Sequence, residues 1–141
     1  MERVRARVAA RLRGDRGTST VEFMIITPLL FLLLLSVVQF GLYYFASTVS
    51  EAAAQAGARK ARATADDNPG SWQNMASTTA QNRISTLGPA LVNGASVFPF
   101  QDGDQVGVTV TGRVVKVVPF LNLTVTAKSV GPIERFVPDA G

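Results

Sequence analysis

The chain has 141 residues and a formal net charge of +4, with neither cysteine nor histidine. This composition excludes disulfide bonds and removes the commonest neutral-pH acid–base group and metal ligand. We therefore expect no catalytic residues, no metal site, no cofactor and no small-molecule substrate.

Residues 1–17 carry almost all of the net positive charge, because they contain six arginines and only two acidic residues. A protein that binds nucleic acid displays its basic residues on a folded face. Here they form a short arm ahead of an apolar segment, so we expect no nucleic-acid partner. We assign residues 1–17 to a cytoplasmic leader.

A run without any charged residue extends from Phe23 to Ser50. It exceeds the roughly 20 residues that a helix needs to cross the hydrocarbon of a bilayer. We assign residues 18–46 to a transmembrane helix and expect a single-pass protein of the cytoplasmic membrane. The arginines ahead of the helix favour a cytoplasmic N terminus and an extracytoplasmic C-terminal part.

A cleaved secretory signal peptide is the competing interpretation of this apolar run. Small residues that suit signal peptidase occur around Ala54. However, the run is far longer than the roughly 7–15 apolar residues of a signal peptide. That alternative predicts release of the protein without its apolar helix.

Residues 47–65 are rich in alanine and predict a continuation of the same helix outside the membrane. Val49, Ala53, Gly57 and Ala61 recur every four residues and therefore share one side of the helix. A stripe of such low relief lets another backbone approach closely. We predict that Ala53, Gly57 and Ala61 are helix-packing positions, at which this helix contacts another subunit.

Residues 66–141 predict a small extracytoplasmic head that begins with a second helix. The turn-forming segment 66–70 ends the long helix, and Ser71 is a suitable N-cap for the next. Trp72, Met75 and Leu87 recur at helical spacing, and we expect them to contact the core. Gly88 and the proline after it end this helix.

Beyond a loop at Asn93–Gly94, the pattern changes to the alternation typical of half-buried strands. We predict strands at 106–111 and 121–128, and a strand-like segment at 113–118. Gly112 is then either a bulge in one long strand or a break between two. We expect the tail from Gly131 to be irregular.

These elements predict an α+β fold anchored in a membrane. It consists of a long N-terminal transmembrane helix that extends outside, a second short helix, and a small antiparallel sheet of two or three strands. The apolar face of such a sheet must be covered, and the two helices are available to cover it. Asp102 and Asp104 flank a glycine and favour a hairpin turn, since a single acidic turn has too few oxygen ligands for calcium.

The most informative motif lies between the basic arm and the apolar run. Gly17 is followed by Thr18, and then by Glu22 and Phe23 at the edge of the apolar segment. This pattern resembles a type IV prepilin cleavage site, in which the bond after the glycine is cut. Glu22 needs a partner at the edge of hydrocarbon. Cleavage creates one, because the new Thr18 amine of a neighbouring subunit is a cation.

The similarity continues from Gly17 to Arg59, where the chain resembles the TadE-like family of pilus assembly proteins, pseudopilins of the tight adherence (Flp) pilus machinery. The matching residues are Gly17, Val21–Phe23, Pro28–Leu30, Phe40–Gly41 and Ala53–Arg59. The segment Pro132–Phe136 is also similar. Family members often carry an acid where this chain has Gln39.

The resemblance implies a pilin-like fold and a minor pseudopilin, since Thr18 replaces the phenylalanine typical of major pilins at the mature N terminus. It implies a prepilin peptidase, other pilin-like subunits, pilus assembly proteins and the lipid bilayer as partners. Glu22, Pro28 and Gly41 are the expected helix-packing residues of the spanning segment. An alternative is an uncleaved, membrane-anchored module that binds an extracytoplasmic ligand.

Overall fold

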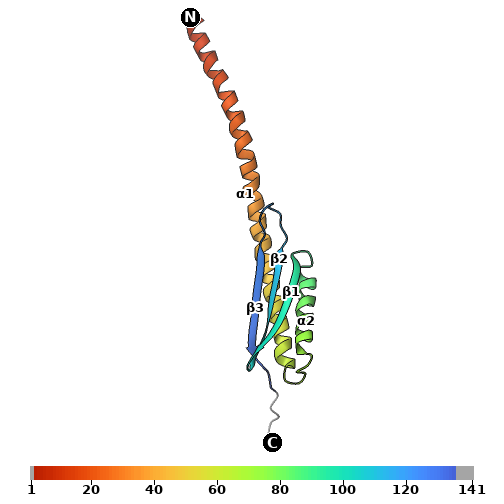
Figure 1. Ribbon diagram of the computed structural model, residues 1–141. Helices are drawn as coiled ribbons and strands as arrows, with labels where there is room; N and C mark the ends of the chain where they lie inside the picture. The colour runs from red at the N-terminus through yellow and green to blue at the C-terminus, as the bar shows by residue number, and fades with distance from the viewer. Residues whose placement is uncertain (1, 136–141) are drawn as a thin grey trace. The chain divides into compact units, whose positions relative to one another are not determined.

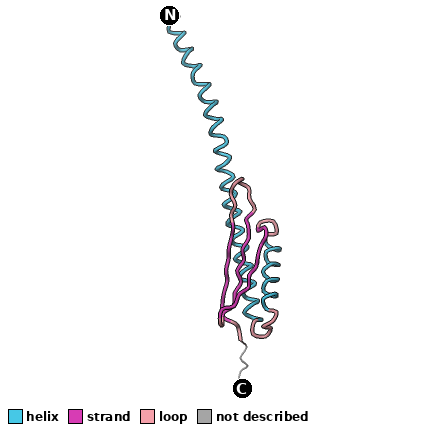
Figure 2. The backbone as a smooth tube through the Cα atoms, in the orientation of Figure 1, coloured by secondary structure: helices cyan, strands magenta, loops and turns pink. Residues whose placement is uncertain are grey.

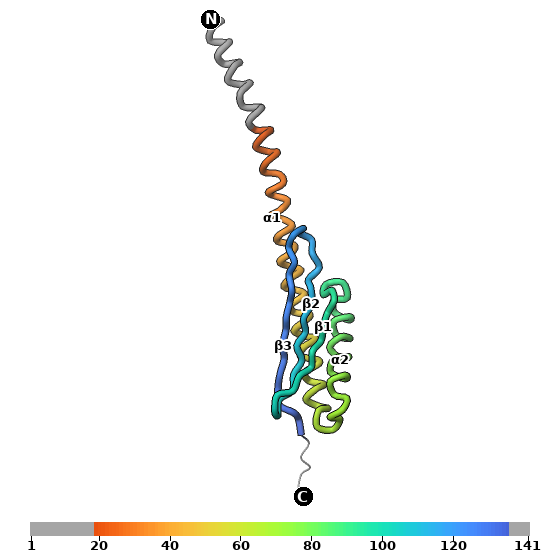
Figure 3. The backbone as a smooth tube through the Cα atoms, in the orientation of Figure 1, coloured from red at the N-terminus to blue at the C-terminus, as the bar shows by residue number. Residues whose placement is uncertain are grey.

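The computed structural model describes the backbone of residues 2–135 and the side chains of residues 19–135. The chain divides into two units, residues 1–38 and residues 39–141. Within residues 2–135, the elements in chain order are two helices and three strands. Figures 1 and 3 show the course of the chain through these elements. The predicted α+β class, with a long apolar helix, a second helix and an antiparallel sheet, is confirmed.

Helix α1 spans Glu2–Thr64 and contains Pro28. Within Ser19–Thr64 it includes a window that is long and apolar enough to cross a membrane, and none of that window is buried by the rest of the chain as described. The core helix of a soluble protein would be largely buried. The expected continuation of the apolar helix through residues 47–64 is confirmed.

Helix α2 spans Trp72–Leu87, with Ser71 at its N-cap and Gly88 at its C-cap. The Ser71 side chain makes no capping hydrogen bond, whereas the Gly88 backbone N–H donates to the Ile84 carbonyl. The buried residues of α2 are Trp72, Ala76, Ala80 and Ile84. Our expectation for Leu87 is wrong, because its side chain is exposed and the buried face of α2 follows a period of four from Trp72.

The sheet has three antiparallel strands in the order β1-β2-β3. Strand β1 spans Val92–Asp102, β2 spans Gln105–Val114 and β3 spans Thr124–Pro132. Figure 2 shows the three strands (magenta) running side by side. The predicted alternation in β2 is confirmed, since Val106, Val108 and Val110 are fully buried.

Strand β1 is longer than the sequence indicates, because the predicted loop at Asn93–Gly94 lies within it. Gly94 has a φ of 60°, and the pairing register shifts between Asn93 and Ser96. The bulge of this sheet therefore lies in β1. Pro99 also belongs to β1, which it can do because a strand at the edge of a sheet has backbone positions that need no donor.

Both expectations for Gly112 are wrong. Gly112 pairs with Val125 in continuous register, and β2 ends at Val114, so residues 115–118 are not a strand. A Cβ at Gly112 would collide with the Val92 side chain, which explains the glycine by close packing. Strand β3 begins later than predicted and continues through Gly131, because it pairs with β2 as far as Pro132.

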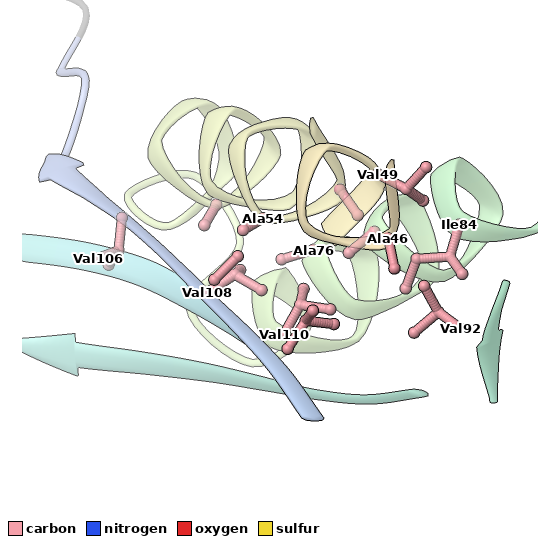
Figure 4. Close-up of a cluster of buried hydrophobic side chains, with 14 of the residues drawn as sticks. Ala46, Val49, Ala54, Ala76, Ile84, Val92, Val106, Val108 and Val110 are labelled. Carbon is pink, nitrogen blue, oxygen red and sulfur yellow. The ribbon is translucent and has the colours of Figure 1, made fainter. Parts of the chain in front are cut away.

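The core of the head lies between the sheet and the two helices. It combines small residues from α1, the buried face of α2 and the valines of β2. Figure 4 shows Ala46, Val49 and Ala54 of α1 close to Ala76 of α2 and to Val108 and Val110 of β2. The second unit thus has two layers, with α1 and α2 covering one face of the sheet.

Candidate functional site

The predicted processing site lies at the edge of the described side chains. Gly17 and Thr18 belong to α1, but their side chains lie outside residues 19–135. Glu22 is exposed, and so is Phe23, which begins the apolar run. Cleavage between Gly17 and Thr18 stays a prediction.

The apolar run of α1 presents large hydrophobic side chains to its surroundings on every side. The exposed residues include Phe23, Ile25, Leu29, Phe31, Leu33 and Val37. Two hydroxyl groups within the run donate back into the helix, Thr27 to the Phe23 carbonyl at 2.7 Å and Ser36 to the Leu32 carbonyl at 2.7 Å. Polar groups satisfied inside one helix suit a segment that lies in hydrocarbon.

Pro28 and Gly41 are residue types that are unfavourable inside a helix, although α1 continues through both. Pro28 lacks a backbone N–H, so the carbonyl one turn earlier has no helical donor. Gly41 is exposed, and a Cβ built on it would meet no described atom within 4 Å. Packing within the described chain therefore does not explain why this position is glycine, although glycine costs a helix about 1 kcal/mol relative to alanine. The roles of Glu22, Pro28 and Gly41 in subunit contacts stay predictions.

The stripe at Ala53, Gly57 and Ala61 packs within the chain itself. A Cβ built on Gly57 would lie 3.0 Å from the Ala76 carbonyl oxygen and 3.2 Å from Cγ2 of Val108. Ala53 and Ala61 are completely buried. The stripe does let other backbones approach closely, but these belong to α2 and β2 of the same chain. It is therefore not a free surface for another subunit, and we correct that assignment.

Gln39 is a buried polar residue whose structural role the sequence did not reveal. Its side chain is 1% exposed and makes three hydrogen bonds to the segment that follows β2. Nε2 donates to the Val115 carbonyl at 3.1 Å, and Oε1 accepts from the N–H groups of Val117 at 2.7 Å and Val118 at 3.2 Å. The signal was an isolated amide in an apolar run, since such a group is retained only when it finds partners.

The segment that Gln39 holds is the β2–β3 loop, residues 115–123. Its side chains are mostly apolar, and Val117, Phe120 and Leu121 are exposed. Phe120 is 98% exposed and has a φ of 77°. A bulky residue rarely adopts a positive φ, so this conformation is an unusual feature of the loop.

The opposite end of the head is joined by ionic contacts from the segment after β3. Arg135 donates from Nη2 to Oδ1 of Asp104 at 2.6 Å, and its Nε lies 3.7 Å from Oδ1 of Asp66. Glu134 lies 3.6 Å from Nε of Arg62, and its backbone N–H donates to the Arg62 carbonyl. Asp104, at the tip of the β1–β2 hairpin, thus pairs with Arg135 from the segment after β3. The hairpin predicted around Gly103 is confirmed.

A groove follows the two helices of the head. Its lining includes Ala52, Ala56 and Arg59 from α1, and Thr79, Asn82 and Arg83 from α2. The two arginines make this surface basic, whereas the alanines keep its floor shallow. Among residues 19–135, no group of three or more Asp or Glu side chains is arranged to hold a metal ion.

Comparison with known proteins locates one similarity. Residues 17–59 match the family model described as TadE-like protein, which confirms the resemblance over that segment. No curated protein and no solved structure matches the chain. The match begins at Gly17 and ends at Arg59, so it covers the apolar run, Gln39 and the part of α1 that packs in the head.

Proposed function

From the TadE-like segment, which indicates a protein associated with tight adherence pili, we propose that this chain is a minor pseudopilin of that assembly system. In this proposal a prepilin peptidase cuts the chain after Gly17, and the mature protein packs through α1 against other pilin-like subunits. The chain is then a substrate of the peptidase and has a structural role. The observation that carries the proposal is that the family match begins at the predicted cleavage site.

The position of the match supports processing at that site. It excludes residues 1–16, which contain the arginines of the leader. If the leader is removed during processing, the family segment is expected to begin at the cleavage site and not within the leader. The arginines keep the leader on the cytoplasmic side, where it anchors the orientation of α1 before it is removed.

Intact-mass measurement of the membrane-extracted protein tests the processing step. In cells with an active prepilin peptidase, we expect a chain that begins at Thr18. Gly17→Val should retain the leader, because a β-branched residue restricts the backbone next to the scissile bond. Gly14→Val makes the same change within the leader and should be processed normally. A wild-type chain that retains residues 1–17 contradicts the proposal and favours the uncleaved anchor.

Subunit packing is assigned to Glu22, Pro28 and Gly41, three exposed residues of α1. After cleavage, the Thr18 amine of one subunit would approach the Glu22 carboxylate of the next. An ion pair between subunits offsets the desolvation of both charges in a low-dielectric environment. Gly41 would let a neighbouring helix approach where no described atom of this chain fills the space.

Glu22→Ala tests this packing through pilus assembly. We expect normal membrane insertion and an intact head, with pili reduced at least about tenfold, since an unpaired terminal amine would remain at each contact. Glu51→Ala is the matched control, because Glu51 is an exposed acid on the same helix outside the hydrocarbon run. Normal piliation by Glu22→Ala, with complete processing, would show that Glu22 has no such role.

The core of the head argues against the alternative in which the chain is cleaved near Ala54 and secreted. Such a cut would remove Gln39, Ala46 and Val49, which are buried in the second unit. It would also separate Ala53 from Gly57, although both lie against the same core. A protein cut there would lose much of one layer of its fold, so the head and the N-terminal helix belong together.

A further inference from the structure

We propose that the β2–β3 loop, residues 115–123, inserts its apolar tip into the interfacial region of the extracytoplasmic leaflet of the membrane that α1 spans. This inference extends the membrane anchoring of the proposed function to a second contact with lipid. It assigns a partner to Val117, Phe120 and Leu121, which are exposed to solvent within this chain.

The position of Gln39 along α1 supports this assignment. The charge-free run begins at Phe23, and roughly 20 helical residues cross the hydrocarbon, so the outer boundary lies near Leu42. Gln39 therefore lies within the last two turns of the spanning helix, both for a boundary near Leu42 and for the assigned end at residue 46. Its three hydrogen bonds hold residues 115–118 at the same level of α1. Figure 2 shows the loop (pink) extending past the ends of β2 and β3.

The backbone of the loop is prepared for a poorly hydrated environment. The N–H groups of Val117 and Val118 donate to Gln39, and Pro119 has no N–H. The N–H of Val115 donates to the Leu91 carbonyl, and that of Leu121 donates to the Val118 carbonyl. Unsatisfied backbone groups are what normally exclude loops from lipid, so these bonds lower the free-energy cost of placing the loop in the interface.

The side chains of the loop also match the interface. Lys116 is its only charged residue, and a lysine can place its ammonium among lipid phosphates while its stem remains in apolar surroundings. Phe120 projects fully from the chain at the tip. Exposed aromatic residues of α1, Phe40 and Tyr44, occupy the same boundary, where aromatic side chains are favoured.

Depth-dependent quenching in vesicles tests the proposal with the full chain. Because the protein contains no cysteine, Phe120→Cys provides a single labelling site for an environment-sensitive nitrobenzoxadiazole probe. The labelled protein is reconstituted into phosphatidylcholine–phosphatidylglycerol vesicles with a nitroxide near the top of the acyl chains. Both leaflets have the same composition, so the result does not depend on the direction of insertion.

Phe98→Cys is the matched control, because Phe98 is an exposed phenylalanine of the same head, on β1. We expect the probe at position 120 to be quenched at least about threefold more than that at 98, with blue-shifted emission, as for an interfacial residue. Equal quenching and equal emission at both positions would overturn the proposal. So would shielding at 120 that rises with the ratio of protein to lipid, since it would indicate contact between protein chains.

Leu33→Cys separates this inference from the membrane anchor itself. Leu33 is an exposed residue in the apolar run of α1. Quenching at position 33 without quenching at 120 would refute the loop insertion and leave the anchor intact. An absence of quenching at both positions, also by a nitroxide placed deep in the acyl chains, would refute the anchor as well. Processing after Gly17 is measured separately by mass.

Discussion

Two parts of one helix, α1 before and after Val38, have opposite relations to the rest of the chain. In the first part, large apolar side chains such as Phe31 and Leu33 are exposed. In the second part, small residues such as Ala53 and Ala61 are completely buried. A continuous backbone element therefore changes its surroundings through side-chain size, because large residues suit lipid or other chains and small ones allow the head to pack closely.

Glycine provides the sharpest way to break this comparison, since α1 has one glycine at an open position in the charge-free run, Gly41, and one at a packed position, Gly57. Gly57→Leu should destabilise the head by about 3 kcal/mol, because the new side chain would overlap α2 and β2. Gly41→Leu should leave the stability of the head unchanged or slightly higher, since leucine favours a helix and the site is open.

Denaturant unfolding of the full chain in micelles measures both variants. Trp72 is the single tryptophan and is buried in the head, so its fluorescence reports the unfolding of this unit. Equal midpoints for the two variants would contradict the difference between the open and the packed position on α1.

Gln39 defines where the second part begins, and its removal should have the next largest effect. Gln39→Leu leaves the Val118 N–H and the Val115 carbonyl without their partner, which should cost about 2 kcal/mol. Amide hydrogen exchange should accelerate at Val117 and Val118. Gln39→Glu should retain slow exchange at these two amides, because a carboxylate accepts the same bonds.

Gln55→Leu is the matched control for that prediction, since Gln55 is exposed on the same helix. Fast exchange at Val117 in this control would indicate that the loop responds to any change in α1. An acid at position 39, as the TadE-like resemblance describes, could accept from the same two amides but would leave the Val115 carbonyl without its donor.

Valine-to-alanine substitutions, each of which removes two methyl groups, sharpen the comparison at single side chains. Val110→Ala should lower the free energy of unfolding by about 1.5 kcal/mol, because Val110 is completely buried between the sheet and the helices. Val37→Ala, in the exposed run of α1, should change it by less than about 0.5 kcal/mol. The fluorescence of Trp72 measures both, and a comparable loss for Val37 would show that the first part also packs on the head.

The ion pairs at the far end of the head should contribute least. Arg135→Ala removes contacts to Asp104 and Asp66, but these side chains are more than half exposed, so the loss should be below about 1 kcal/mol. Raising the salt concentration should reduce the difference from the wild type, since surface pairs are screened. A loss that is larger and independent of salt would mean that the segment after β3 holds the head by packing instead.

The sequence determined the features that depend on local composition and periodicity. The charge-free run identified the candidate spanning helix, the alternating valines identified β2, and Gly88 marked the end of α2. The stretch from Gly17 to Arg59 also carried enough family-specific residues to identify the TadE-like resemblance. Each of these signals lies within one segment, so no contact between distant residues was needed to recognise it.

The tertiary structure alone decided which partner each surface meets. A stripe of small residues has the same pattern whether it faces another subunit or its own sheet, and only the fold placed Gly57 against α2 and β2. An isolated amide in an apolar run does not identify its acceptor and donors, and those of Gln39 are 76 to 79 residues away. Strand β1 could be recognised only from its pairing with β2. The hydrogen bonds of a sheet form between segments, so the sequence of one segment predicts a strand only weakly.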